Sequence, residues 1–295
     1  MLYPVIDIGS NTVKLAVLDE EKIFSSVPVL FKAVPLNLRS KIENGILSDT
    51  AVKELGELMV TFRDMAARLT STPPVAFATA SLRGVENAED VLVHVLRVSG
   101  IEVEIVSGED EAYYSFLGAR GSHRVRSGVV VDLGGGSTEI LAFRGDRVEK
   151  AVSLPFGCLT LFHRFFERND QYELCCDYIL RTVRAMAPAI PGNSILLTGG
   201  SAKAVLKYKN FLEDKRTFTL GTRQMRAVRK HYKVGGEKER ERIASVLKDR
   251  FRLIPPAVAV FLQITRYYKK EQVTVCRGGV REGYLYHRLQ KLKKI

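Results

Sequence analysis

The feature that most constrains the fold of this chain is a phosphate-loop pattern that occurs twice. The first copy is residues 6–12 (IDIGSNT) and the second is residues 131–138 (VDLGGGST), so that Asp7 and Asp132 lie 125 positions apart. In each copy a short apolar run ends in aspartate, opens into glycine and small hydroxyl residues, and is followed by a second apolar run. This order predicts a strand, a tight turn and a second strand, repeated in two similar lobes.

Each loop has the residue types that bind a phosphate group. Glycine lets the backbone bend where a Cβ would clash, so that successive N–H groups converge on an anion. The aspartate at the strand end can hold a divalent cation, or a water molecule, beside that anion. One such loop alone is more often a simple turn. The presence of two matching loops favours a single phosphorylated ligand that binds between two lobes. The residues that we expect to bind phosphate are Gly9, Ser10, Asn11 and Thr12 in the first loop and Gly134, Gly135, Gly136 and Ser137 in the second.

The length and composition of the chain agree with two globular lobes. Its 295 residues exceed the usual size of one domain, and 46% of them are hydrophobic. No apolar run reaches the ~20 residues of a membrane span. The first residues lead into a strand without the features of a signal peptide. We therefore expect a cytoplasmic protein with no membrane partner.

The cysteines give no sign of a metal site. Cys158, Cys175, Cys176 and Cys276 show no CxxC spacing, and no His/Cys set lies near them. We expect small buried apolar side chains. A disulfide among them stays open for a hyperthermophilic source, where intracellular disulfides occur.

The charge of the chain is divided unequally between its halves. Residues 1–150 contain 16 Lys and Arg against 21 Asp and Glu, whereas residues 151–295 contain 29 against 12, a net charge of +17. Such a field attracts polyanions, which include nucleic acid, an anionic membrane surface and a long phosphate chain; a solvated helix surface is the alternative. Nucleic acid is disfavoured, because the chain has no Trp and few interleaved aromatic residues for base stacking. The densest basic residues are Lys207, Lys209, Lys215, Arg216, Arg223, Arg226, Arg229, Lys230 and Lys233.

Strand and helix signals alternate along the chain, as in an α/β protein. The polar, basic segment 123–128 is the expected boundary between the lobes. Helices are expected from Ser48 or Asp49 to about residue 69, over 87–99, from Gly108 onward, near 159–166 and 174–187, from Gly199, and over 280–292. Strands are expected over 75–79, 101–106, 194–198 and 273–276.

Two groups of polar residues between the loops suit phosphate chemistry. Arg83 follows the expected strand 75–79, where its guanidinium can make a bidentate contact to phosphate; a surface salt bridge is the alternative. Glu109, Asp110 and Glu111 form an acidic cluster at a helix start, where compensation of the helix dipole is the alternative. Hydrolysis of a phosphoanhydride needs a phosphate cradle, charge neutralisation and an oriented water molecule. These residues and the two loops can supply all three.

Seven short segments, taken in order, resemble the exopolyphosphatase and guanosine pentaphosphate phosphatase (Ppx/GppA) family. That family belongs to the actin-like, sugar-kinase-like ATPase superfamily. Each segment alone is common, but the series covers nearly the whole chain in the family's order. The segments are DIGSNT (7–12), ATASLR (78–83), IVSGEDEA (105–112), VDLGGGSTE (131–139), LPFGC (154–158), TGGSA (198–202) and RGGVREG (277–283).

The resemblance implies an α/β fold of two actin-like (ribonuclease H-like) lobes around a central cleft. The N-terminal lobe, residues 1–122, is expected to carry the first phosphate loop and the catalytic glutamate. The C-terminal lobe, residues 123–295, is expected to carry the second loop and the basic helical part, with the option that the last helix, about 280–295, packs back on the first lobe. Some family members carry a further helical domain with a His-Asp metal motif; we expect the short two-lobe form here, and the resemblance implies a homodimer.

The resemblance also implies catalytic roles. Glu111 is the expected general base that activates the attacking water, with Arg83 as a further catalytic residue. Asp132 and Glu139 are expected to hold Mg²⁺ or another divalent cation and to position water, and Asp7 to face them as a metal ligand from the first loop.

Two further positions are assigned by resemblance alone. Lys14 stands where the family often has arginine, and it keeps the charge for phosphate binding but loses the planar fork. Gly199, Gly200 and Ser201 match a third loop that lies near the nucleotide base in the wider superfamily. In an enzyme of polyphosphate they can simply belong to the fold.

We therefore expect a hydrolase of phosphoanhydride bonds, an exopolyphosphatase that removes terminal phosphate from inorganic polyphosphate with Mg²⁺ and water. The alternative is a 5′-phosphohydrolase of guanosine pentaphosphate, which presents the same anhydride to the same loops. Less favoured are a sugar-kinase-type phosphotransferase, which would transfer phosphate from ATP to an alcohol, and a non-catalytic polyanion-binding protein.

Overall fold

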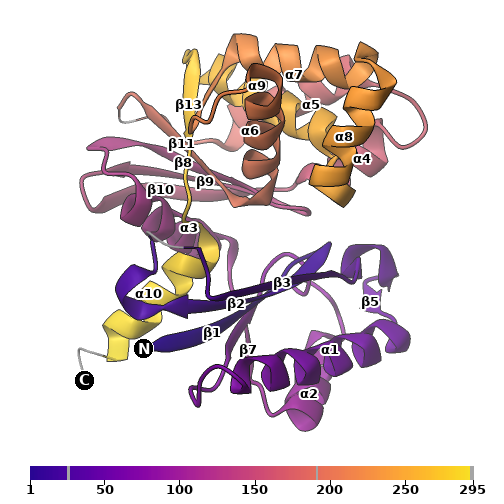
Figure 1. The fold of residues 1–295 in the computed structure, drawn as a ribbon, viewed down its shortest axis with the longest axis vertical. Coiled ribbons are helices and arrows are strands. Elements are labelled where there is room, and N and C mark those ends of the chain that lie inside the picture. The colour runs from indigo at the N-terminus through magenta and orange to yellow at the C-terminus, as the bar shows by residue number, and fades with distance from the viewer. Residues whose placement is uncertain (25–26, 191, 293–295) are drawn as a thin grey trace. The chain divides into compact units, whose positions relative to one another are not determined.

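The computed structural model describes residues 1–24, 27–190 and 192–292 (Figure 1). The chain forms two compact units, which we describe separately. Unit 1 comprises Met1–Gly118 and Val280–Ile295, and unit 2 comprises Ala119–Gly279. The lobe boundary that the sequence predicts after residue 122 lies four residues beyond this division, and the last helix belongs to unit 1.

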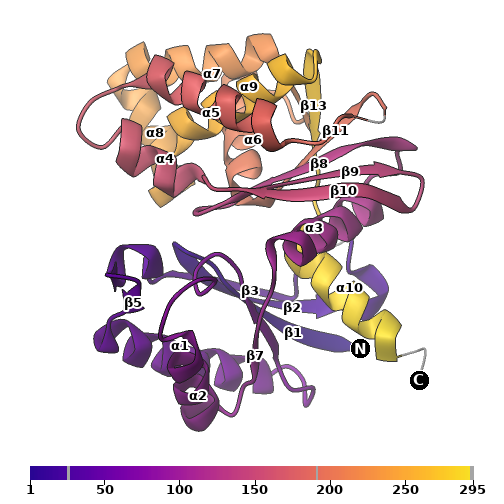
Figure 2. The same ribbon diagram turned by 180° about the vertical axis from the view of Figure 1, so that it is seen from behind.

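Unit 1 is built on a sheet with the strand order β3-β2-β1-β6-β7 (Figures 1 and 2). Strands β1, β2 and β3 form an antiparallel meander, and β6 and β7 run parallel to β1. The strand bounds are β1 Leu2–Ile8, β2 Thr12–Asp19, β3 Leu30–Pro35, β6 Val75–Ala78 and β7 Val103–Ile105, with a small hairpin of β4 Ile42–Glu43 and β5 Ile46–Leu47. The helix bounds are α1 Asp49–Ala67, α2 Ala88–Ser99, α3 Gly108–Ser122, which ends in unit 2, and α10 Val280–Leu292, with short 3-10 turns η1 Glu20–Lys22 and η2 Leu38–Lys41.

Alternation along β1 gives unit 1 a core on each face of its sheet. Ile6 and Ile8 belong to the cluster that α1 and α2 cover, whereas Val5 belongs to the cluster that includes Tyr114 of α3 and Tyr284 of α10. Successive strand residues point to opposite faces, so one buried strand can serve both cores. The strand that carries the first loop is therefore fixed from both sides.

Helix α1 begins where the sequence predicts. The Ser48 side chain accepts a hydrogen bond from the Ala51 N–H at 3.4 Å and so caps the helix. Ala51, Leu55, Met59 and Phe62 then recur at helical spacing and are fully buried.

Unit 2 is built on a sheet with the order β10-β9-β8-β11-β13-β12. The meander β8-β9-β10 is antiparallel, and β11 and β13 extend it parallel to β8. The strand bounds are β8 Ser127–Leu133, β9 Thr138–Arg144, β10 Arg147–Leu154, β11 Ser194–Thr198, β12 Thr219–Gly221 and β13 Gln272–Val275. The helix bounds are α4 Cys158–Phe165, α5 Tyr172–Met186, α6 Gly199–Glu213, α7 Thr222–Val234, α8 Glu237–Leu247 and α9 Ile254–Tyr267, with the 3-10 turn η3 Lys248–Arg250 before α9.

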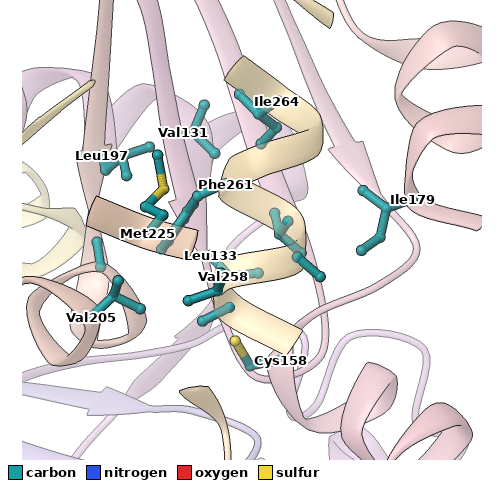
Figure 3. Packing of buried hydrophobic residues seen from close by; sticks show 14 of the residues in the cluster. Val131, Leu133, Cys158, Ile179, Leu197, Val205, Met225, Val258, Phe261 and Ile264 are labelled. Carbon is teal, nitrogen blue, oxygen red and sulfur yellow. The ribbon is translucent and has the colours of Figure 1, made fainter. Parts of the chain in front are cut away.

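The core of unit 2 lies between its sheet and its helices (Figure 3). Val131 of β8 and Leu197 of β11 meet Val258 and Phe261 of α9, and all four side chains are fully buried. Helix α9 is buried on nearly all sides, and this explains its almost entirely apolar sequence.

The repeat in the sequence is a repeat in the structure. In each unit a three-stranded antiparallel meander lies at one side of the sheet, its first strand carries the aspartate and glycine loop, and parallel strands follow on the other side. The expected α/β class with two similar lobes is confirmed.

Some predictions needed correction or completion. Strands β10 and β12 were not predicted, because β10 has a largely exposed, polar face and β12 is only three residues long. All four cysteines are free and buried, as small apolar residues. Among the described residues no helix is long and apolar enough to cross a membrane.

Candidate active site

The first loop is a tight turn in which the Ser10 and Asn11 carbonyls are hydrogen-bonded, while the N–H groups of these two residues are open. The Gly9 N–H donates to the Thr12 carbonyl at 3.2 Å. The carbonyls of Ser10 and Asn11 accept hydrogen bonds from backbone N–H groups of the segment 36–39. In the described part of the chain the N–H groups of Ser10 and Asn11 donate to no protein acceptor. The loop is therefore an anion cradle of the kind that the sequence predicts.

The second loop has the same design with a different support. The Gly134 N–H donates to the Ser137 carbonyl at 3.1 Å, which is the bond that Gly9 makes in the first loop. The Gly134 and Gly135 carbonyls accept N–H groups from the first turn of α4. A Cβ on Gly157, the residue before α4, would overlap the Gly135 backbone. The segment 154–158 therefore holds the second loop in place, a role that its motif alone did not reveal.

The aspartates of the two loops, Asp7 and Asp132, face neighbours whose charges differ in sign. Asp7 lies opposite Lys14 in the β1–β2 register, and the Lys14 Nζ is 2.7 Å from its Oδ2. Asp132 lies opposite Glu139 in the β8–β9 register, and both are buried. The Ser153 hydroxyl of β10 donates to the Glu139 Oε1 at 2.8 Å. Unit 2 thus places two carboxylates side by side where unit 1 has an ion pair.

The structure distinguishes Glu111 from its two acidic neighbours. Glu109 and Asp110 are exposed, whereas Glu111 is 6% exposed. Asp110 accepts a hydrogen bond from the Ser107 hydroxyl at 2.7 Å, and the Ser107 oxygen caps α3 by accepting the Asp110 N–H. The α3 start therefore explains the two exposed acidic residues, while Glu111 points to a separate environment.

Glu111 is held by Arg83. The Arg83 Nη2 lies 2.5 Å from the Glu111 Oε2, and the Arg83 Nε donates to the Val106 carbonyl at 3.2 Å. A guanidinium beside a carboxylate favours the ionised form of that carboxylate. The remaining N–H groups of this guanidinium can still bind phosphate. The salt bridge that the sequence left as an alternative for Arg83 exists, and it joins two of the expected catalytic residues.

Sheet topology gathers these residues within unit 1. Strands β1, β6 and β7 are parallel neighbours, so their carboxyl ends meet at one edge of the sheet. The first loop follows β1, Arg83 follows β6 and Glu111 follows β7. The Ser81 hydroxyl donates to the Ile8 carbonyl at 2.5 Å and ties the turn after β6 to the end of β1. Ligands of open α/β sheets bind at this edge.

The same rule gathers a second set within unit 2. The second loop follows β8 and the third loop follows its parallel neighbour β11. Gly199 has a φ of +80°, and a Cβ on it would stand 2.5 Å from the Asp132 Oδ1. Only glycine is free of strain with this backbone angle and this close approach. The third loop therefore lies directly against the predicted metal ligand Asp132.

Arg250 is a candidate site residue that the sequence did not single out. It comes from η3, just before α9, and its guanidinium lies where a Cβ on Gly200 would be. This arginine lies in a stretch rich in Lys and Arg, where no local pattern marks it. Only the long-range packing of η3 against the third loop identifies it.

Cys158 lies between the second and third loops but is not a nucleophile. Its N–H supports the Gly134 carbonyl, and its thiol contacts Ser201. Burial raises the pKa of the Cys158 thiol to about 12, so that it stays protonated near neutral pH.

The carboxylates near the second loop suit a metal cation that keeps several water molecules as ligands. Among the described residues no three His, Cys, Asp or Glu side chains gather into a metal-binding group. The pair Asp132 and Glu139 supplies two carboxylates on one face of the sheet. Mg²⁺ is usually bound through one or two carboxylates together with water and substrate phosphates. These two residues therefore fit Mg²⁺, whereas the Asp7 carboxylate is already paired with Lys14.

Comparison with known proteins gives consistent matches over the chain. Residues 25–292 match the model of the Ppx/GppA phosphatase family. The chain is 28% identical over 308 residues to "Exopolyphosphatase 1" of Mycobacterium tuberculosis and of Mycobacterium bovis, with 98% of this chain and 88% of each relative covered. Both the chain and these relatives are thus aligned over most of their length.

Solved structures share the fold. The crystal structure of the Aquifex aeolicus Ppx/GppA family member superposes with a TM-score of 0.82 at 24% identity, covering 99% of this chain and 98% of that one. A crystal structure of an exopolyphosphatase from Cytophaga hutchinsonii gives a TM-score of 0.82 at 18% identity, with the same coverage. At these identities the likeness establishes the fold, and the predicted α/β fold class of two similar lobes is confirmed.

Proposed function

Because the chain belongs to the Ppx/GppA phosphatase family, we propose that it is an exopolyphosphatase that removes the terminal phosphate of inorganic polyphosphate by Mg²⁺-dependent hydrolysis. The family makes it a hydrolase of phosphoanhydride bonds, and the curated relatives at 28% identity are exopolyphosphatases. The cleft between the lobes, the homodimer and the cytoplasmic location stay predictions.

The observation that carries the proposal is the Arg83–Glu111 pair. A buried carboxylate, paired with a guanidinium, lies at the same sheet edge as an open anion cradle. An ionised carboxylate can accept a proton from water, and an arginine can bind a phosphoryl group with its other N–H groups. A merely structural ion pair needs no phosphate cradle beside it.

In the proposed step Glu111 takes a proton from a water molecule, and the water oxygen attacks the terminal phosphorus. The bond from this phosphorus to the bridging oxygen breaks, and the electron pair leaves with the shortened chain. Arg83 and the open N–H groups of the first loop, which lie at one edge of the unit 1 sheet, hold the terminal phosphoryl oxygens. Phosphoryl transfer depends mainly on such positioning and charge neutralisation.

We propose Asp132 and Glu139 as the residues that hold Mg²⁺. When bound, the ion neutralises charge on the phosphate oxygens and orders water beside them. The Ser153 hydroxyl orients Glu139 from β10. Asp7 contributes by holding Lys14 at the first loop, where the ammonium can offset phosphate charge.

Guanosine pentaphosphate 5′-phosphohydrolase activity is the second candidate. The observation that favours it is the third loop with the Arg250 guanidinium against Gly200. A planar cation beside open backbone can bind further phosphates or stack on a base. The match to a phosphatase family favours the hydrolase over the sugar-kinase and non-catalytic alternatives.

The test is phosphate release with Mg²⁺ from long-chain polyphosphate, guanosine pentaphosphate and ATP in parallel. Release from polyphosphate that EDTA and Glu111→Gln abolish is the expected result. Release from guanosine pentaphosphate alone would favour the second candidate. Binding of polyphosphate without release would contradict the proposed catalysis.

A further inference from the structure

The outer face of helix α7 carries a continuous row of positive charge. Arg223, Arg226, Lys230 and Lys233 are all exposed. At ~100° per residue they fall within an arc of ~80° on the helix surface and span ~15 Å. We call these four residues the α7 stripe.

Most of the charge of the α7 stripe has no acidic partner in the part of the chain that the structure describes. Helix α7 contains no acidic residue. Among the described residues Arg223, Arg226 and Lys230 form no ion pair, and only Lys233 has a partner, Asp170, at 3.6 Å. The neighbouring α8 differs, because its first turns alternate Glu with Lys and Arg. A solvated helix face normally has the mixed charge pattern of α8. The exposed face of α7 carries only positive charge, and this favours binding of an external anion.

The helix that carries the α7 stripe is anchored by its buried face. Met225 and Val228 on the opposite face of α7 are fully buried. Arg229 is turned away from the stripe onto the Tyr172 ring, with its guanidinium 3.4 Å from the ring centroid. Figures 1 and 2 both draw α7 at the end of unit 2 farthest from β9, the strand that follows the second loop. A ligand that lies on the stripe is therefore remote from that loop.

We propose that the α7 stripe is a secondary binding site for the distal part of a long inorganic polyphosphate chain. The inference rests on the proposed function. Four cations at ~5 Å intervals match a linear chain with a negative charge on every phosphate, and each contact releases a counterion. A nucleic acid fits less well: Tyr232 of α7 is half-buried and packs on Phe251, so α7 offers no exposed ring for base stacking. We expect a short substrate to occupy the loops without contacting the stripe.

The test compares two variants that lose the same charge. The first is Arg223→Gln/Arg226→Gln/Lys230→Gln, and the matched control is Arg147→Gln/Lys150→Gln/Arg184→Gln, at exposed positions of unit 2 without ion pairs among the described residues. Affinity for long-chain polyphosphate is measured directly at several salt concentrations, and turnover is measured with long-chain polyphosphate and with tripolyphosphate.

We expect the affinity of the stripe variant for long chains to fall about tenfold or more. The slope of log K against log salt concentration should become less negative by about 2. Turnover of tripolyphosphate should stay unchanged in both variants. Equal losses in the stripe variant and the control would overturn the proposal, since the effect would then be one of net charge. Tighter binding of a single-stranded RNA than of polyphosphate at the stripe would overturn it as well. Absence of turnover in the parent protein would contradict the proposed function alone, because the binding comparison tests the stripe independently.

Discussion

Replacement of Glu111 by glutamine tests the proposed general base most directly. Glutamine has nearly the same shape and keeps an oxygen that can accept a hydrogen bond from Arg83, but it cannot take a proton from water. We expect kcat to fall by ~10²- to 10⁴-fold, the range that general base catalysis contributes. Binding of polyphosphate should stay the same or tighten, because a negative charge beside the cradle is removed.

The structure also sets the expected cost in stability. The Glu111 side chain is 8% exposed and the Arg83 side chain is 28% exposed. Loss of an exposed ion pair costs ~0–1 kcal/mol and loss of a buried one ~3–5 kcal/mol. Arg83 is partly hydrated and keeps its bond to the Val106 carbonyl, so we expect a value of about 1–2 kcal/mol, nearer the exposed limit. A thermal melt should therefore move by only a few degrees, too little to explain the fall in kcat at assay temperature.

The assay is steady-state phosphate release from long-chain polyphosphate with saturating Mg²⁺, and Glu109→Gln is the matched control. Glu109 lies on the same first turn of α3 but is exposed, so its replacement should leave kcat nearly unchanged. A near-normal rate for Glu111→Gln would refute the reasoning. So would an equal fall in the Glu109 variant, since the effect would then come from the charge of the helix start and not from one base.

Four other changes test separate parts of the site. Arg83→Lys should lower kcat by ~10- to 100-fold in the same assay, because lysine keeps the charge but cannot hold Glu111 and a phosphate with one planar fork. Glu139→Gln should raise the Mg²⁺ concentration for half-maximal activity by ~10-fold or more in a metal titration. Gly157→Ala should destabilise the fold by ~1–3 kcal/mol in a denaturant titration and lower activity, because its Cβ overlaps the second loop. Burial raises the pKa of the Cys158 and Cys276 thiols to about 12, so a thiol reagent at pH 8 should label them slowly in the native protein and fully in denaturant.

Controls for these changes lie at positions with less packing. Glu149→Gln, on the exposed part of β10, should not alter the Mg²⁺ requirement. Gly236→Ala should be tolerated, because its Cβ would meet only the Glu239 carboxylate, at 3.9 Å. A Mg²⁺ requirement that is the same in Glu139→Gln and the parent would remove Glu139 from the metal site. Rapid native labelling of Cys158 would contradict its burial.

The loops and the strands that carry them could be predicted because their signals are local. Glycine after an apolar run marks a turn wherever it occurs, and Ser48 caps α1 through its own neighbour Ala51. The choice of Glu111 among three acidic residues is different. Composition treats the three alike, so the sequence singled out Glu111 through the family resemblance alone. The phase of α3 and the approach of Arg83 then separate the buried carboxylate from the exposed ones.

The missing parts of the prediction depend on contacts between distant segments. Arg250 lies 50 positions after Gly200, and nothing local links them. The packing of Gly157 on Gly135 is of the same kind, since it needs β9 and β10 to return the chain to the second loop. Strand β10 itself was missed because an edge strand with a polar face lacks the apolar alternation that marks a strand.

One cross-strand position distinguishes the surroundings of the two loop aspartates, and we propose that it separates the roles of the loops. Lys14 and Glu139 occupy equivalent positions in the two loops. They lie 125 positions apart in the sequence, as Asp7 and Asp132 do, and each is paired with its loop aspartate across the two strands. The same backbone site thus holds a cation in unit 1 and an anion in unit 2. An aspartate beside lysine is a neutral pair that leaves an ammonium near the cradle for phosphate, whereas an aspartate beside glutamate is stabilised by a divalent cation. We therefore propose that the cross-strand residue decides which ligand each loop favours, phosphate at the first loop and a divalent cation at the second.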